Sequence, residues 1–193
     1  MKIRTAIAGA AVAAFALTLT PAVAHADDVV RNGNYTLSAG RTIDGDLTVR
    51  NGTVVLRGTV KGNVRQTGSG NVIVENRGYV EGNVVESSGG GVTVRGYATV
   101  EGNVEEYDTG NATVQGSATV DGNVIEKGNG SALINARVNG NVEEEGYDHI
   151  YLYGSARVDG NAIEKHTGNI YRYSGSRVSG DIEESGAGRV IRR

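Results

Sequence analysis

The residues best suited to chemistry in this chain are glutamates that recur at a constant distance from glycine. Each stands four residues after a glycine, and Gln66 occupies the corresponding place after Gly62. The glutamates of this column are Glu86, Glu106, Glu126, Glu144, Glu164 and Glu184. Several hard carboxylate oxygens together are the ligands that Ca²⁺ prefers, but no D-x-D-x-D-G loop accompanies them. Because stacked buried carboxylates would be very unfavourable, we expect the backbone to turn here and the side chains to reach solvent.

Residues that could carry catalysis are few. After position 26 the chain has two histidines, His149 and His166, no cysteine and no G-x-S-x-G motif. The glycine-rich stretch 87–91 is not expected to lead into a helix whose N-terminus could bind phosphate. A polysaccharide lyase or hydrolase would need a carboxylate cluster in a groove with long flanking loops, whereas the corners here are short. We therefore predict that the protein is not an enzyme and has no catalytic site, cofactor or metal.

The glutamates belong to a repeat that runs along most of the chain. A Gly-Asn or Gly-Asp pair recurs at intervals of 17, 18 or 20 residues. An aliphatic residue stands two positions before and two positions after each of these glycines, and a second alternating pair such as Val72 and Val74 follows. Period-two alternation in short β-branched runs, punctuated by glycine, indicates strands joined by tight corners.

A unit of about 20 residues with three short strands cannot bury its apolar face alone, whereas stacked units can. We therefore predict an all-β fold, a single-stranded parallel β-helix (β-solenoid) of about eight coils of 17–20 residues. The expected organisation is a signal peptide at 1–26, an N-terminal partial coil at 27–42 and the β-helix at 43–193. The shortened intervals should lose residues at one corner, as the comparison of 114–120 with 134–140 indicates.

The asparagine of the repeated pair is interpreted as a structural ladder. Asparagine tolerates left-handed backbone geometry and can hydrogen-bond to the identical side chain above and below it. The ladder residues are Asn63, Asn83, Asn103, Asn123, Asn141 and Asn161. On another face Arg137, Arg157 and Arg177 stack beside polar residues, for which we expect cross-strand pairing.

Four tyrosines mark a possible interaction face. Tyr151 and Tyr153 alternate with apolar residues and should point outward, and Tyr171 and Tyr173 stand one coil further on. Stacked outward tyrosines form an amphipathic surface that suits recognition. The alternative is that they only decorate the exterior.

The first 26 residues have the features of a secretory signal peptide. Lys2 and Arg4 precede an apolar run of about 14 residues, and Ala-His-Ala at 24–26 is a cleavage signal. The run is shorter than the roughly 20 residues of a membrane span, and no cysteine follows it for lipid attachment. An uncleaved anchor is the alternative, but we expect a secreted, extracellular protein with no stable membrane insertion after cleavage.

Charge limits the partners that we expect. The net charge of −3 becomes about −5 without Lys2 and Arg4, which argues against nucleic acid or an anionic membrane. The ends of the expected rod differ, with Asp27 and Asp28 at one end and Arg189, Arg192 and Arg193 at the other. Uncapped strand edges of opposite charge favour head-to-tail self-association.

The recurring phrase V-x-G-N-V, in coils of 17–20 residues, resembles the bactofilins, a family of polymer-forming cytoskeletal β-helix proteins. The resemblance covers about residues 40–185. It implies a right-handed β-helix that polymerises end to end without nucleotide, through contacts between like ends, so the polarity of assembly stays open. Two features depart from the family pattern: the export signal, and the glutamate four residues after glycine.

These observations lead to two hypotheses about function. The first is an exported structural protein that self-associates end to end, as a homo-oligomer or filament, or joins a cell-surface layer. The second is a secreted binding module that recognises a glycan or protein of the cell envelope through its tyrosine face.

Overall fold

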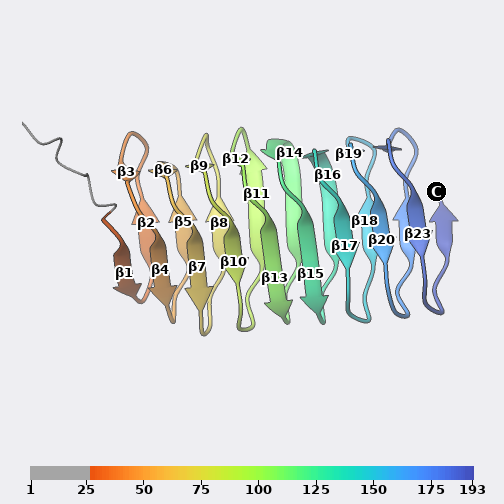
Figure 1. Cartoon of the computed structure of the whole chain (residues 1–193), viewed down its shortest axis with the longest axis horizontal. Helices are drawn as coiled ribbons and strands as arrows, with labels where there is room; N and C mark the ends of the chain where they lie inside the picture. Colours follow the sequence, from red (N-terminus) through yellow and green to blue (C-terminus); the bar gives the residue numbers. More distant parts are fainter. Residues whose placement is uncertain (1–26) are drawn as a thin grey trace, which may run out of the picture.

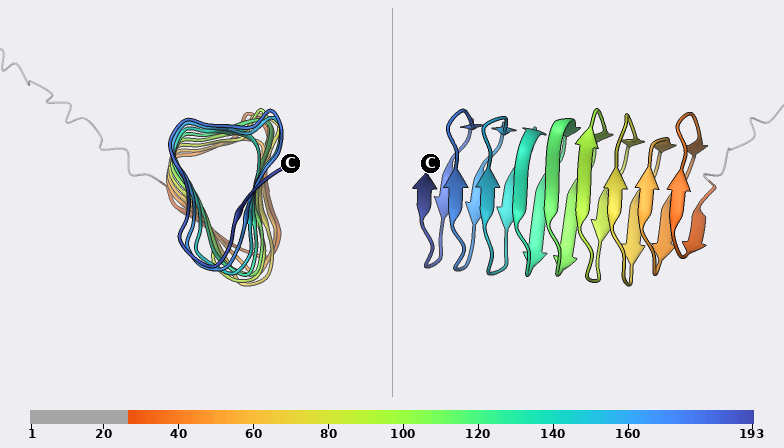
Figure 2. Two further views of the ribbon diagram at one scale, coloured as in Figure 1. Left: turned by 90° about the vertical axis from the view of Figure 1, so that its right-hand side faces the viewer. Right: turned by 180° about the vertical axis from the view of Figure 1, so that it is seen from behind.

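The structure, a computed structural model, describes residues 27–193, so the predicted signal peptide lies outside the described residues. The described chain forms 24 short strands, which wind into a β-solenoid of about eight turns (Figure 1). Viewed along its axis, the rod has a three-sided outline (Figure 2). The predicted fold class is thus confirmed. Nothing in this described part is helical, so no helix there could span a membrane.

Each side of the rod is a row of parallel strands that pair with their counterparts one coil away. Row 1 begins each coil, directly after Asp27-Asp28 in the first coil and directly after the Gly-Asn or Gly-Asp pair in every later one. Its strands are β1 (Val29–Asn32), β4 (Leu47–Arg50), β7 (Val64–Thr67), β10 (Val84–Glu86), β13 (Val104–Asp108), β15 (Val124–Gly128), β17 (Val142–Glu144), β20 (Ala162–Glu164) and β23 (Ile182–Glu184).

Row 2 carries the second alternating pair of each repeat, such as Val72 and Val74. Its strands are β2 (Tyr35–Leu37), β5 (Val54–Leu56), β8 (Val72–Val74), β11 (Val92–Gly96), β14 (Ala112–Val120), β16 (Ala132–Val138), β18 (Ile150–Leu152), β21 (Ile170–Arg172) and β24 (Val190–Arg192). Row 3 is shorter, because the chain soon reaches the next glycine. It contains β3 (Thr42–Ile43), β6 (Thr59–Val60), β9 (Tyr79–Val80), β12 (Thr99–Val100), β19 (Arg157–Val158), β22 (Arg177–Val178) and the second halves of β14 and β16.

The corner between rows 2 and 3 absorbs the difference in coil length. Gln115 of β14 pairs with Asn135 of β16, whereas Thr119 pairs with Arg137, so β16 has two residues fewer at this corner. The longer corner of β14 uses Gly116 with a φ of 76°, a left-handed conformation that favours glycine. The predicted loss of residues at one corner is confirmed here, and the apolar columns continue through it without a break.

The core is a narrow file of aliphatic side chains from the three rows. The inward residues of the middle coils, such as Val104, Val114 and Val120, are completely buried. The small residues Ala98, Ala118, Ala136 and Ala156 fill the corner before row 3. Identical or similar residues stack directly on one another because the strands pair in parallel and in register.

The asparagine column forms a ladder with a direction along the rod. The side-chain Oδ1 of each asparagine accepts a hydrogen bond from the backbone N–H of its counterpart in the next coil, as Asn103 does from Asn123 at 2.8 Å. Asp28 begins the same pattern by accepting from the N–H of Asp46, Asp46 accepts from Asn63, and Asp181 ends the pattern by donating its N–H to Asn161. The expected left-handed backbone at these asparagines is wrong, because their φ angles are not positive. In each coil the asparagine Oδ1 instead pairs with a backbone N–H of the next coil. This hydrogen bond explains why asparagine recurs at the position without a left-handed backbone.

Candidate functional site

The glutamates that were expected at a solvated corner lie inside the solenoid. Gln66 and the glutamates of the five middle coils have no exposed surface, and only Glu184 of the last coil is half-buried. The alternation of row 1 continues through these residues, so Glu126 points inward like Val124 two residues before it. The prediction of a solvated corner is therefore wrong: the backbone turns only after the glutamate.

Four carboxyl groups of this column accept hydrogen bonds from the backbone of the turn that follows them. Glu164 Oε1 accepts from the N–H groups of His166 at 2.9 Å and Gly168 at 3.0 Å. Glu144 Oε1 accepts from Gly146 at 2.8 Å. Glu86 and Glu184 bond to their own turns in the same way. These carboxyls satisfy turn amides that would otherwise be unpaired.

The middle of the column has no such partners. Both carboxyl oxygens of Glu106 and Glu126 are buried without a hydrogen-bond partner, as is the second oxygen of Glu144. Burial raises the pKa of Glu106 and of Glu144 to about 7, and that of Glu126 to about 10. Across 27–193, no three His, Cys, Asp or Glu residues form a group arranged to hold a metal ion. The Ca²⁺ interpretation of the column therefore gains no support.

The structure brings the four predicted tyrosines together on the outside of row 2. Tyr151 stacks on Tyr171 with ring centroids 4.9 Å apart, and Tyr153 stacks on Tyr173 at 5.1 Å. His149 packs edge-on against Tyr151 and Tyr171, at 5.8 and 5.3 Å. Parallel pairing of β18 with β21 produces this arrangement, because it places each tyrosine directly over the next.

The stacking determines what the tyrosine face can offer. The two rings of each pair cover one face of each other, and the guanidinium of Arg193 lies 4.8 Å from the ring centre of Tyr171. All four side chains are half-buried. In the pair of Tyr151 and Tyr171, the accessible parts are thus mainly ring edges and hydroxyl groups. These parts suit hydrogen bonds with a ligand better than stacking of a ligand on a ring.

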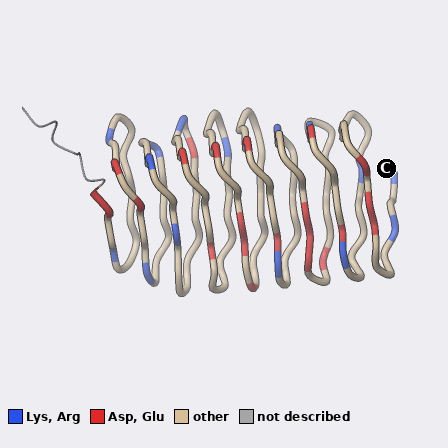
Figure 3. The backbone as a smooth tube through the Cα atoms, viewed as in Figure 1, with Lys and Arg blue, Asp and Glu red and all other residues tan. Residues whose placement is uncertain are grey.

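The charged residues predicted at the ends lie at opposite ends of the rod and are all exposed (Figure 3). Asp27 and Asp28 precede β1, while Arg189, Arg192 and Arg193 lie in or beside β24. Within residues 27–193, the strands β1, β2 and β3 pair on one side only, and so do β22, β23 and β24. Each end therefore presents strand edges that could pair with another chain.

Sequence reasoning missed one charged residue at these ends, Arg31. Arg31 occupies the glutamate column in the first coil, in register with Val49, and its guanidinium lies 5.5 Å from the centre of the Tyr35 ring. Glu184 occupies the same column in the last coil. The position of Arg31 in the repeat is the signal that could have revealed it, although this residue precedes the first complete coil.

The far end also changes the character of the core. Arg172 and Arg192 continue an inward column that is Leu152 in the preceding coil. Beside them Ile182 and Val178 are half-buried, and Val190 is 43% exposed. This end is therefore an apolar surface bordered by charge.

The arginine column on row 3 shows the expected pairing only in part. Arg137 donates to Asn139 at 2.6 Å and forms an ion pair with Asp159. Arg157 instead donates to the backbone carbonyls of Ala156 and Gly175. Nothing in these contacts indicates a ligand, so the column is explained by structural roles.

Comparison with known proteins supports the resemblance drawn from the repeat. A family model described as bactofilin, polymer-forming cytoskeletal, matches residues 35–128. No curated protein and no solved structure matched the chain. The matched segment runs from β2 to the end of β15 and includes the first three glutamates of the buried column, Glu86, Glu106 and Glu126.

Proposed function

We propose that the protein is a structural protein whose rods join end to end, head to tail; its similarity to the polymer-forming bactofilin family supports this function. The observation that carries the proposal is that rows 1 and 2 end in strands that pair on one side only, β1 and β2 at one end of the rod and β23 and β24 at the other. Unpaired parallel edges of this kind are templates for another chain.

Head-to-tail contact would continue the rows without a change of direction. The strand β1 of one rod would extend row 1 beyond β23 of the next, and β2 would extend row 2 beyond β24. In this arrangement Val29 stacks on Ile182 and Tyr35 stacks on Val190, as the same columns do inside the rod. The contact would therefore bury the half-exposed apolar residues of both ends.

Charge and hydrogen bonding favour the same polarity. Arg31 and Glu184 belong to one column, so head-to-tail stacking places the guanidinium against the carboxylate. The asparagine ladder would continue as well, because Asp28 presents its N–H at one end and Asp181 its carboxylate at the other. A contact between like ends would bring two copies of Arg31 to one interface. Growth of a head-to-tail contact does not close, and it produces filaments.

We place this assembly outside the cytoplasm. The proposal rests on the signal-peptide features of residues 1–26, which lie outside the described structure. Mass spectrometry of the protein in the medium of its host should find an N-terminus at Asp27. Retention in the cell with an intact Met1 would contradict export but would leave the assembly proposal standing.

Electron microscopy and sedimentation of the chain from Asp27 test the assembly. We expect filaments one rod wide, and an assembled fraction that grows with concentration. Arg31→Glu and Glu184→Arg should each reduce this fraction, and the two variants mixed, or combined in one chain, should restore part of it. Restoration of this kind is expected only if the two residues meet across the contact.

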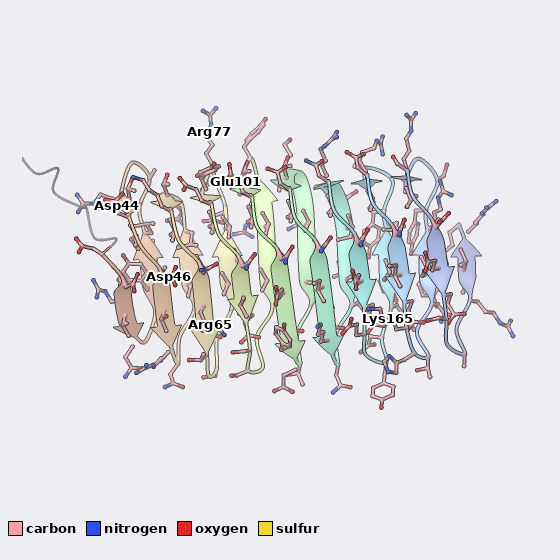
Figure 4. All side chains as sticks on the ribbon, viewed as in Figure 1. Asp44, Asp46, Arg65, Arg77, Glu101 and Lys165 are labelled. Carbon is pink, nitrogen blue, oxygen red and sulfur yellow. The ribbon has the colours of Figure 1, made fainter. Side chains whose placement is uncertain are left out.

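The control is Arg65→Glu, at an exposed arginine on β7 that is labelled in Figure 4 and lies away from both ends. This variant should assemble like the wild type. A wild type that sediments only as a monomer at high concentration and low salt would refute end-to-end assembly. Assembly that is indifferent to both charge reversals would refute the head-to-tail polarity alone.

A further inference from the structure

We propose that the buried glutamates form a ladder of protonated carboxyl groups that hydrogen-bond to one another from coil to coil, and that this ladder makes the solenoid sensitive to alkaline pH. The ladder comprises Glu86, Glu106, Glu126 and Glu144, with Gln66 at one end and Glu164, which accepts hydrogen bonds from its own turn, at the other. The proposal does not depend on the proposed function, because the ladder lies inside a single rod.

The geometry places the carboxyl groups in contact range. Glu106 pairs in register with Glu86 on one side and with Glu126 on the other, and Glu126 pairs in register with Glu144. Paired strands lie about 4.8 Å apart, and side chains of equal length leave their carboxyl groups at the same depth. The groups that face Glu126 from neighbouring coils of its own row are therefore two other carboxyls.

Protons resolve the shortage of hydrogen-bond partners in this column. An ionised carboxylate can only accept hydrogen bonds, so two of them cannot bond to each other. A protonated carboxyl donates through its O–H group to the next oxygen, and such a bond is short and strong when the acceptor is ionised. One proton between neighbours would thus give partners to the otherwise unpaired oxygens of Glu106 and Glu126.

The surroundings favour neutral carboxyls. The inward residues of the facing rows are apolar, among them Val114, Ile134 and Val120. Outside the column, the charged residue that acts on it is Asp108, which raises the pKa of Glu86 and Glu106 further by repulsion. Lys127 pairs with Glu145, and Lys165, which is labelled in Figure 4, pairs with both Glu143 and Glu145 on the outside of the rod.

The column already contains one neutral side chain of the same size. Gln66 is completely buried, and its Nε2 donates to the carbonyl groups of Gly68 at 3.0 Å and Gly52 at 3.3 Å. It occupies the place that glutamate takes in the next coil. The site therefore accepts an uncharged donor, which is the character that we assign to the protonated glutamates.

The sign of the pH dependence follows from proton uptake on folding. Burial raises the pKa of Glu106, Glu126 and Glu144 above the value of 4.5 for a free glutamate, to between about 7 and about 10. The folded chain then binds more protons than the unfolded chain throughout this interval. The stability that the ladder contributes is complete below the unfolded pKa, and it is lost as the pH rises through the folded values.

Infrared spectroscopy of the wild type tests the protonation directly. At pH 6 we expect a C=O band of buried carboxylic acid, which shrinks as the pH rises to 10 and survives addition of Ca²⁺. The melting temperature should fall by about 5 °C or more between pH 6 and 9. Absence of the acid band at pH 6, or a melting temperature that does not fall, would overturn the proposal.

Glutamine variants locate the effect in the column. Glu126→Gln should melt like the wild type at pH 5 and at a higher temperature at pH 9, and a triple variant that also replaces Glu106 and Glu144 should lose most of the pH dependence. The control Glu81→Gln removes an exposed carboxylate and should leave the dependence unchanged. If millimolar Ca²⁺ raises the wild-type melting temperature at pH 9, the column binds cations and the proton ladder is wrong.

Discussion

Two columns of row 1 stand two residues apart on the same strands and differ in chemistry. One is aliphatic and includes Val104 and Val124, whereas the other is acidic and includes Glu106 and Glu126. Both are completely buried. The comparison shows that the alternation of side chains along the strand determines which residues face inward. The side chains of the neighbouring coils then determine whether a polar residue at an inward position is stable.

The two columns satisfy themselves by different means. An aliphatic column needs only contact with its own kind, and parallel in-register pairing supplies it. A carboxyl column must find hydrogen bonds, which the following turn supplies at Glu164. At Glu126 the partners that we propose are the neighbouring protonated carboxyls. In a solenoid each inward residue stacks on its counterpart in the next coil. A residue type can therefore form an inward column only if its side chain can pack against, or hydrogen-bond to, another side chain of the same type.

The largest effect should come from placing a carboxylate in the aliphatic column. Val124→Asp puts a charge where turn amides and other carboxyls are out of reach, and we expect a loss of about 4 kcal/mol or more in the free energy of unfolding. Urea denaturation followed by circular dichroism measures the loss.

The matched control is the next residue on the same strand. Ile125 points outward and is half-buried, so Ile125→Asp should cost about 1 kcal/mol. Equal losses for the two variants would contradict the assignment of inward and outward positions on row 1.

A middle-sized effect should come from removing a carboxyl that caps its turn. Glu164→Ala leaves the N–H groups of His166 and Gly168 without their acceptor, and Gly168 is buried. We expect a loss of about 2 kcal/mol at pH 6, because unpaired buried donors are costly. Glu164→Gln retains an acceptor oxygen and should recover most of this loss in the same urea titration. A glutamine variant as unstable as the alanine variant would show that the turn amides are not what the side chain supports.

Most of the fold could be predicted from the sequence, because every coil repeats the same pattern of aliphatic residues and glycines. Period-two alternation identified the strands, and near-constant spacing identified the parallel stack and the aliphatic columns that are buried in the structure. The shortened corner at 134–140 was also predictable, since the columns on either side of it resume in register.

The acidic column was misjudged for a physical reason. The alternation alone pointed Glu126 inward, but the cost of burying isolated carboxylates was set against it and was given more weight. That cost assumes charged groups without partners, whereas these groups have turn amides, raised pKa values and one another. Likewise, the contact that we propose between Arg31 and Glu184 depends on the register that places both in one column.

A carboxylate outside the core provides the opposite case to the ladder. Glu75 follows β8 and is 6% exposed; its two oxygens accept from the Nε atoms of Arg57 and Arg95, both at 2.8 Å. The hydrogen bond from Arg95 is the main cause that lowers the pKa of Glu75, and Arg57 adds to it. Its contribution to stability is present above the unfolded pKa and is lost as the pH falls through the lower folded pKa.

The smallest of the three effects should come from Glu75→Gln, and its pH dependence should be the reverse of that for Glu126→Gln. Near pH 7 we expect Glu75→Gln to cost about 1–2 kcal/mol, because the charge-assisted hydrogen bonds from two arginines become weaker ones. The difference from wild type should fade as the pH falls through the lowered folded pKa of Glu75, where the wild-type carboxyl itself becomes protonated. Glu126→Gln should instead match the wild type in acid and exceed its stability in base. Urea midpoints of the two variants at pH 4, 7 and 9 measure both trends, and a shift in the same direction for both would show that burial and ion pairing do not separate these glutamates.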